Sequence, residues 1–164
     1  MTIRAAILTV SDAGARGERV DTSGPALREM LAGIGAEVAH AEVVPDERDL
    51  IRDVLARWCD PPDAVDLVLT TGGTGLAARD VTPEATLDVA DRLAPGIAEA
   101  MRAEGMRQTP MAMLSRAVAA VRRRTLIVNL PGSERGARES LAAILEVLPH
   151  AVDLLRGDTA HGGG

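Results

Sequence analysis

A glycine-rich turn followed by an acidic residue forms the clearest chemical pattern in this sequence. The segment is LTTGGTGLAARDVTPEAT, residues 69–86. An apolar stretch that favours a buried strand leads directly into Gly72, Gly73 and Gly75. Because glycine adopts positive φ at little steric cost, the backbone of such a turn can approach a ligand closely. A turn of free amide groups before a helix is a favourable site for phosphate or another anion.

Asp46 and Asp80 are acidic residues whose carboxylates could hold a metal ion. Mg²⁺ usually takes one or two protein carboxylates, and water and phosphate oxygens complete its octahedron. Asp46 lies in VPDE and Asp80 in RDVTP, both of which are expected to be loops. The residues alone leave a second interpretation open, in which Asp46 caps the following helix and Asp80 only shapes a turn.

Alternating apolar segments predict the elements that position these residues. Strands are expected over residues 3–10, 37–44, 65–71 and 125–130. Helices are expected to begin near Ser23, Asp46, Thr82 and Ser133, which can act as N-caps, and the helix that begins at Thr82 is expected to run over 84–93. Further helical segments are expected over 97–105, 109–120 and 151–156. This order predicts an α/β three-layer sandwich, with a mostly parallel sheet and helices on both faces. We expect one domain over residues 1–156 and a flexible tail over 157–164.

Ligands of such sheets bind beyond the carboxyl ends of the strands. The loops that begin at Ser11, Pro45, Gly72 and Pro131 all follow predicted strands. They are far apart in the sequence, but we expect them to meet at one edge of the sheet. The candidate phosphate turn and both candidate carboxylates therefore belong to one predicted site.

The composition excludes several classes of function. The formal net charge is -6, and the chain contains no lysine, so neither a Schiff base nor the lysine of a phosphate-binding P-loop is available. Trp58 is the only aromatic residue among Phe, Tyr and Trp, which argues against base stacking on single-stranded nucleic acid. An acidic protein is also a poor binder of nucleic acid or anionic membranes. We expect neither partner.

The sequence also predicts a cytoplasmic protein. Cys59 is the single cysteine and cannot form an internal disulfide, so a reducing compartment is expected, with Cys59 packed in the core. No apolar run reaches the roughly 18 residues of a membrane span, and no leader pattern precedes the first strand.

A dinucleotide-binding fingerprint is a rival interpretation of the turn. Gly73, Gly75 and Ala78 satisfy the spacing G-x-G-x-x-G/A. That motif must open a helix directly, whereas here the helix is expected to start only at Thr82 or Pro83. We therefore interpret the match as accidental, although it leaves a nicotinamide-dependent oxidoreductase as a hypothesis to test.

Five ordered segments together resemble a known family. They are ILTVSD with GERVDTSG in the first loop, VPDE in the second, TTGGTG with RDVTPEAT, then TPMAMLSR, and finally NLPGS. They are similar to the molybdenum cofactor biosynthesis family, specifically its stand-alone molybdopterin adenylyltransferases of the MogA and MoaB type. The resemblance covers nearly the whole chain. It implies a molybdopterin-binding α/β domain, usually a homotrimer, that transfers AMP from Mg-ATP to the terminal phosphate of molybdopterin and releases pyrophosphate. A separate molybdenum-insertion protein is the implied next partner.

The resemblance also implies roles for individual residues. Asp46 and Asp80 match the functional aspartates and are assigned to catalysis and to Mg²⁺. The implied substrate-binding residues are Ser11, Asp12, Asp21, Thr71, Gly72, Gly73, Thr74, Gly75, Ser115, Arg116, Pro131, Gly132 and Ser133. Among them, Ser115 and Arg116 are expected to hold the pterin, and Arg116 with Arg79 to contact phosphate. Glu134 stands where the family usually has a proline, which weakens detailed expectations for that loop. A pterin-binding or scaffold protein without catalytic activity remains the alternative.

Overall fold

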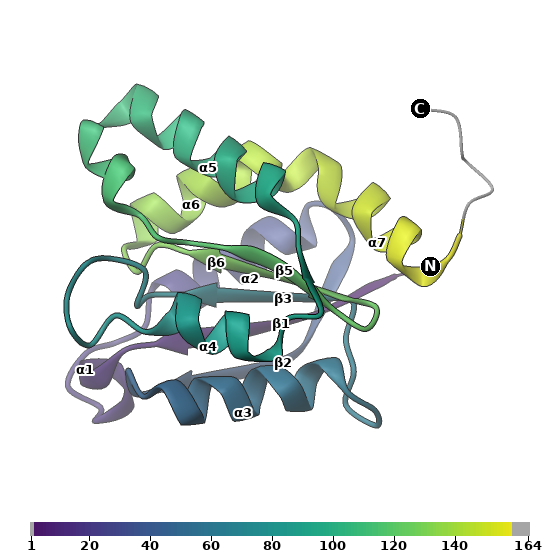
Figure 1. Ribbon diagram of the computed structural model, residues 1–164, viewed down its shortest axis with the longest axis horizontal. Coiled ribbons are helices and arrows are strands. Elements are labelled where there is room, and N and C mark those ends of the chain that lie inside the picture. Colours follow the sequence, from purple (N-terminus) through teal and green to yellow (C-terminus); the bar gives the residue numbers. More distant parts are fainter. Residues whose placement is uncertain (1, 159–164) are drawn as a thin grey trace.

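The computed structural model describes residues 2–158 (Figure 1). The strands are β1 (Ile3–Val10), β2 (Ala36–Val44), β3 (Leu67–Thr71), β4 (Arg92–Leu93), β5 (Ala119–Arg122) and β6 (Thr125–Leu130). The helices are α1 (Asp12–Ala15), α2 (Ser23–Ala32), α3 (Arg48–Cys59), α4 (Thr82–Val89), α5 (Pro95–Gln108), α6 (Glu134–Ile144) and α7 (Leu148–Arg156), with 3-10 turns η1 (Pro110–Leu114) and η2 (Leu145–Val147).

All six strands form one sheet in the order β2-β1-β3-β6-β5-β4. Strands β2, β1, β3 and β6 are parallel, whereas β5 runs antiparallel to β6 and β4 antiparallel to β5. Helices α2, α5, α6 and α7 contribute to the core on one face, and α3 and α4 to the core on the other. The predicted α/β three-layer sandwich with a mostly parallel sheet is confirmed.

Strand β1 shows how the sequence supplies both cores. Ala5 and Ile7 belong to the cluster under α2 and α6, and Ala6 and Leu8 belong to the cluster under α3. Because successive side chains of a strand point to opposite faces, a strand covered on both sides must be apolar at every position. The run of apolar residues that predicted this strand is therefore a direct consequence of its central place in the sheet.

The antiparallel edge is where the predicted elements were wrong. The helix expected over 84–93 ends at Val89, and Arg92–Leu93 pairs with β5 as a strand. The segment expected to be helical over 109–120 holds η1 and the start of β5. Its alanines favour a helix, but pairing with β6 buries Ala119 and Ala120 almost completely, and this tertiary contact decides the outcome.

Two predicted caps were also wrong in an informative way. Ser23 and Thr82 lie inside the first turns of α2 and α4, whose N-caps are Thr22 and Val81. Their hydroxyls donate hydrogen bonds to the carbonyls of Gly132 and Gly72 instead. Both side chains therefore tie a helix start to a loop of the predicted site.

The C-terminal helix α7 ends at Arg156, and Gly157 follows in a left-handed conformation. The rest of the predicted tail, residues 159–164, lies outside the described residues. Burial, the main cause, raises the pKa of the Cys59 thiol to about 12, in keeping with the packing role expected for it. Within residues 2–158, no helix is long and apolar enough to cross a membrane.

Candidate active site

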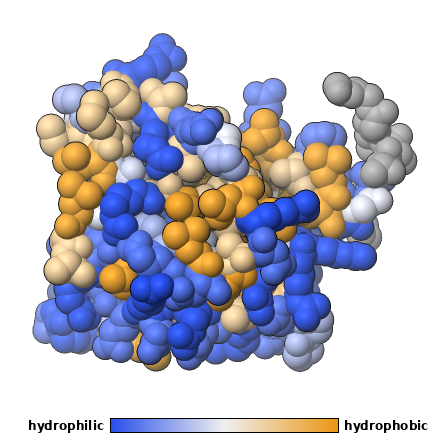
Figure 2. All heavy atoms as spheres, in the orientation of Figure 1, coloured by the Kyte–Doolittle hydropathy of each residue, from blue (hydrophilic) through white to orange (hydrophobic). Residues whose placement is uncertain are grey.

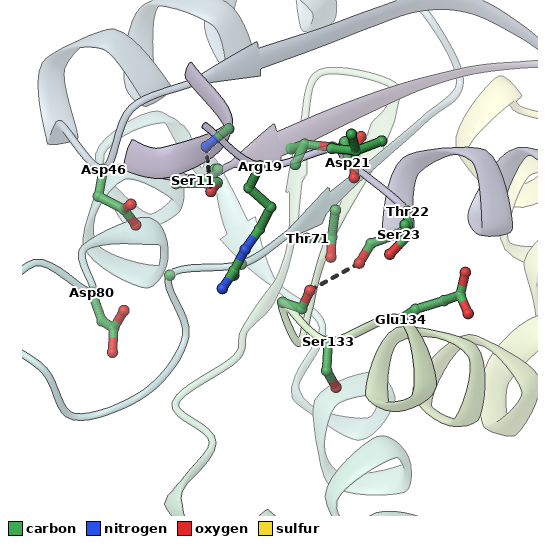
Figure 3. Close-up of a pocket in the computed structure, with 17 residues that line it drawn as sticks. Ser11, Arg19, Asp21, Thr22, Ser23, Asp46, Thr71, Asp80, Ser133 and Glu134 are labelled. Carbon is green, nitrogen blue, oxygen red and sulfur yellow. Dashed lines mark hydrogen bonds between the residues drawn. The ribbon is translucent and has the colours of Figure 1, made fainter. Parts of the chain in front are cut away.

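A cavity of about 590 Å³ opens at the carboxyl ends of the central parallel strands (Figure 3). Its volume falls in the usual range for small-molecule sites of roughly 300–1,000 Å³. The lining comes from loops far apart in the sequence: Thr9, Val10, Ser11, Gly14, Arg19, Val20, Asp21, Thr22, Ser23, Asp46, Thr71, Gly72, Gly73, Asp80, Gly132, Ser133 and Glu134. The four loops predicted to converge at one edge of the sheet thus contribute to a single cavity.

In the glycine turn the carbonyl groups are hydrogen bonded to the protein, whereas three of the amide groups are free. Gly72 has φ 103° and Gly73 has φ 70°, a region that favours glycine. The carbonyls of Gly72 and Gly73 accept from the hydroxyl and the amide of Thr82, and those of Thr74 and Gly75 accept from Arg116. Within residues 2–158, the N–H groups of Gly73, Thr74 and Gly75 have no hydrogen-bond acceptor. This pattern of free amides is that of an anion-binding turn.

Asp46 and Asp80 flank the glycine turn and line the same cavity. A Cβ built on Gly73 would lie 3.2 Å from Asp46 Oδ1, and one built on Gly75 would lie 2.9 Å from Asp80 Oδ2. The pKa of Asp46 is raised, chiefly by burial and further by the charges of Asp12 and Asp80. A cation bound by the two carboxylates would favour their ionised forms and so oppose this rise in the pKa.

Asp46 does not cap α3. The N-cap is Glu47, and Asp46 Oδ2 instead accepts a hydrogen bond from the Asp12 amide at 2.9 Å. Asp80 does shape its own loop, because its Oδ2 accepts from the Ala77 amide at 3.0 Å. The interpretation of Asp46 as a helix cap is therefore wrong. The interpretation of Asp80 as a turn residue holds for Oδ2, which bonds within the loop.

The two aspartates fit a Mg²⁺ site, in which the protein usually supplies only one or two ligands. Within the described chain, Asp46 Oδ1 and Asp80 Oδ1 make no hydrogen bond to the protein. No group of three or more acidic, histidine or cysteine side chains that could hold a metal gathers among residues 2–158. One or two carboxylates, with water and phosphate filling the remaining positions, is the usual arrangement for Mg²⁺.

Asp12 supports Asp46 from outside the cavity. Its Oδ1 accepts from the Asp46 amide at 2.9 Å, so the two residues exchange backbone-to-carboxylate hydrogen bonds across two loops. Arg79 donates to both Asp12 oxygens, at 2.9 and 2.8 Å. These bonds, led by those from Arg79, lower the pKa of Asp12 to about 2. The residue predicted to bind substrate thus serves to fix the Asp46 loop.

We expect Asp12→Asn to destabilise the protein in a pH-dependent way. The folded pKa of about 2 lies below the ordinary 3.8, so the stabilisation is complete above pH 3.8 and is lost as the pH falls toward 2. The free energy of unfolding, measured by urea titration at several pH values, should differ between wild type and variant near neutrality and converge near pH 2. A difference that grows on acidification would contradict this arrangement.

Several other predicted residues line the cavity but use their side chains within the protein. Asp21 accepts from the Thr9 hydroxyl and the Gly24 amide, which leaves its carboxylate less suited to a ribose than expected. Thr71 donates to the Pro131 carbonyl at 2.6 Å. Ser133 accepts from the Gly136 amide and caps α6, as predicted. The N-termini of α2 and α6 both reach the cavity, and their partial positive charge favours an anion.

Five of the predicted substrate-binding residues besides Asp12 do not line this cavity: Thr74, Gly75, Ser115, Arg116 and Pro131. Thr74 and Gly75 belong to the bordering turn. Ser115 lines a separate space of about 60 Å³ near α5. Arg116 and Arg79, expected to contact phosphate, pair instead with Glu84 and Asp12.

Arg19 is the cation that the residue-by-residue prediction did not single out. It lines the cavity, and Figure 3 shows its side chain extending into the space beside Thr71. The same lining also contains four acidic residues, Asp21, Asp46, Asp80 and Glu134. Within residues 2–158, no hydrogen bond or ion pair engages its guanidinium, unlike that of Arg16, which pairs with Glu18. Its place in the first loop was a usable signal, but nothing in the sequence shows which arginines are already paired.

Comparison with known proteins agrees with this geometry. Residues 6–150 match the family described as a probable molybdopterin binding domain. The molybdopterin adenylyltransferase of Helicobacter pylori strain J99 is 43% identical over 96% of this chain and 90% of its own, and that of Escherichia coli K12 is 38% identical over 95% and 87%. The crystal structure of the molybdopterin biosynthesis enzyme MoaB from Thermus thermophilus has 61% identity and a TM-score of 0.90, covering 95% of this chain and 98% of that one. This chain therefore belongs to the molybdopterin-binding domain family of molybdenum cofactor biosynthesis proteins.

Proposed function

We propose that this protein is a molybdopterin adenylyltransferase that uses Mg-ATP. The observation that carries the proposal is that Asp46, Asp80 and Gly73 line one cavity, which the free amides of the glycine turn border. Full-length relatives that are named for this activity support it. The nicotinamide alternative loses its basis, because α4 begins only at Thr82 and the glycine motif follows β3 without opening a helix.

The proposed reaction requires neutralisation of charge rather than a strong base. A terminal phosphate oxygen of molybdopterin forms a bond to the α-phosphorus of ATP. The bond from that phosphorus to the bridging oxygen breaks, and its electron pair leaves with pyrophosphate. The nucleophile is already an anion, so positioning and electrostatic stabilisation supply most of the rate enhancement.

The chain offers three sources of stabilisation for the phosphates. The amides of Gly73, Thr74 and Gly75 can bind phosphate oxygens, and the N-termini of α2 and α6 add partial positive charge. Arg19 adds one full charge. Asp46 and Asp80 would hold Mg²⁺, which when bound supplies charge neutralisation on the phosphates.

The proposal is tested directly with purified protein, ATP, Mg²⁺ and molybdopterin. We expect adenylylated molybdopterin and pyrophosphate in equal amounts, identified by mass spectrometry and by a coupled pyrophosphate assay. Omission of Mg²⁺ should abolish both products. If the protein binds molybdopterin but makes neither product with all components present, the non-catalytic alternative replaces the proposal.

Arg19→Gln should weaken the binding of ATP more than it slows the reaction. A hydrogen bond between charged groups contributes about 1.5 kcal/mol or more, so we expect KM for ATP to rise roughly tenfold. Steady-state kinetics as a function of ATP concentration measures this change. Arg16→Gln is the matched control, since Arg16 lies in the same loop, pairs with Glu18 and does not line the cavity. Equal effects of the two substitutions would remove Arg19 from the site.

We further propose a cytoplasmic homotrimer that passes its product to a separate molybdenum-insertion protein. Exposed apolar side chains on η1, Met111, Met113 and Leu114, provide surface that an assembly can bury. Figure 2 shows hydrophobic residues among the hydrophilic surface of the face in view. Light scattering during size-exclusion chromatography measures the assembly, and a monomeric mass would contradict the trimer.

A further inference from the structure

We infer that Arg116 is a positioning residue that holds the glycine turn and Asp80 in register, and that it does not bind the substrate phosphate. The kinetic part of this inference rests on the proposed function. Arg116 lies between η1 and β5, and its backbone amide donates to the Thr74 carbonyl at 2.8 Å. The side chain donates from Nε to the Gly75 carbonyl and from Nη2 to the Asp80 carbonyl, both at 2.7 Å.

These bonds join the two ends of one loop. Gly75 is the last residue of the anion-binding turn, and Asp80 lies two residues before α4, which begins at Thr82. Within that loop Asp80 closes a smaller ring, since its amide donates to the Ala77 carbonyl and its carboxylate accepts from the Ala77 amide. The guanidinium of Arg116, which lies outside the cavity, therefore fixes the position of the free amides of the glycine turn relative to the Asp80 carboxylate, which is assigned to the metal.

Glu84 fixes the guanidinium in turn. Arg116 Nη1 lies 2.9 and 2.8 Å from the two oxygens of Glu84, which belongs to the first turn of α4. Arg116 is therefore neutralised and anchored to a helix before any ligand arrives. Its planar fork can hold two carbonyls and one carboxylate at once, whereas the single ammonium group of lysine cannot reproduce that geometry.

A phosphate ligand and a loop clamp make opposite predictions. A ligand in this position would contribute mainly to ground-state binding, so its loss would raise KM with little change in kcat. A clamp contributes to the alignment of reacting groups, where small displacements cost large factors in rate. The absence of Arg116 from the cavity lining and its full set of protein acceptors favour the clamp.

The first test needs no substrate. Amide hydrogen exchange is followed for Ala77, Asp80 and Thr82, whose N–H groups are hydrogen bonded in the clamped loop. We expect exchange at least about tenfold faster in Arg116→Gln than in wild type. Arg107→Gln is the matched control, because Arg107 is an exposed arginine that pairs with Glu104 on the outside of α5. Unchanged exchange in Arg116→Gln would overturn the inference.

The second test measures AMP transfer by Arg116→Gln and Arg116→Lys. We expect kcat to fall about 10- to 100-fold in both, as for residues that orient metal ligands, with KM for ATP and molybdopterin changed less than about threefold. A rise in KM at constant kcat, rescued by lysine as a point charge, would instead identify a phosphate ligand. If Arg116→Gln does not fold, Glu84→Gln is tested instead, because it leaves the bonds from Arg116 to the Gly75 and Asp80 carbonyls in place. It should show a smaller fall in kcat and a smaller increase in amide exchange. If wild type transfers no AMP but the exchange result holds, the clamp stands and the proposed function falls.

Discussion

Asp80→Asn is expected to reduce AMP transfer by at least about 100-fold while leaving the binding of molybdopterin within a few-fold of wild type. The substitution keeps the size of the side chain and, through its carbonyl oxygen, the hydrogen bond from the Ala77 amide. It removes the negative charge of a carboxylate that lines the cavity. Loss of one well-placed electrostatic contact to a transition state costs roughly 10²–10³ in rate, and loss of a metal ligand should reach that range.

Transfer is measured by the rate of pyrophosphate release at saturating ATP and increasing Mg²⁺, and molybdopterin binding by equilibrium titration. The matched control is Asp91→Asn, which removes a carboxylate that accepts a hydrogen bond from the Arg123 amide at the β5–β6 turn. This turn lies at the amino end of β6, whereas the cavity lies at the carboxyl ends of the parallel strands. Full transfer by Asp80→Asn at the same Mg²⁺ concentration would remove Asp80 from catalysis. Equal loss of transfer and of molybdopterin binding would mean that it shapes the site without holding the metal.

The three central parallel strands β1, β3 and β6 were predictable because each is buried on both faces. Such strands must be apolar throughout, and β1, β3 and β6 are therefore visible as short apolar runs that end in polar loops. Parallel connection then requires their carboxyl ends to lie on one edge, which is why the sequence alone could place Asp46, Asp80 and the glycine turn together.

The antiparallel edge and the pairing of charges were not predictable in the same way. Strand β4 has only two residues, both exposed, so no periodicity can reveal it. The sequence contains 18 basic residues, and which of them are free to meet a ligand depends on partners distant in the chain. Arg116 is 32 residues from Glu84 and Arg79 is 67 residues from Asp12, so only the folded structure separates these paired cations from Arg19.

Gly72→Ala should be among the most destabilising single substitutions in this protein. Gly72 adopts φ 103°, and a Cβ at this position would lie 2.2 Å from the Val10 carbonyl oxygen. The Val10 carbonyl and the Gly72 backbone that would carry the Cβ lie at the ends of paired strands, where Thr9 is aligned with Thr71, so neither can move without disturbing the β1–β3 pairing. A strained left-handed residue alone costs about 1–3 kcal/mol, and the added backbone clash should bring the loss of unfolding free energy to about 4 kcal/mol.

Two controls separate the steric contact from the backbone conformation. Gly35 has φ 74° with no atom within 4 Å of a built Cβ, so Gly35→Ala should cost only about 1 kcal/mol. Gly96 lies in α5 with open space around it and no positive φ, so Gly96→Ala should be neutral or stabilising by about 0.5–1 kcal/mol. The three values come from urea unfolding under identical conditions. If Gly72→Ala lost no more stability than Gly35→Ala, the backbone at the end of β1 would be able to move away from the added Cβ. The anion-binding turn would then lack the rigid support that its proposed role in catalysis requires.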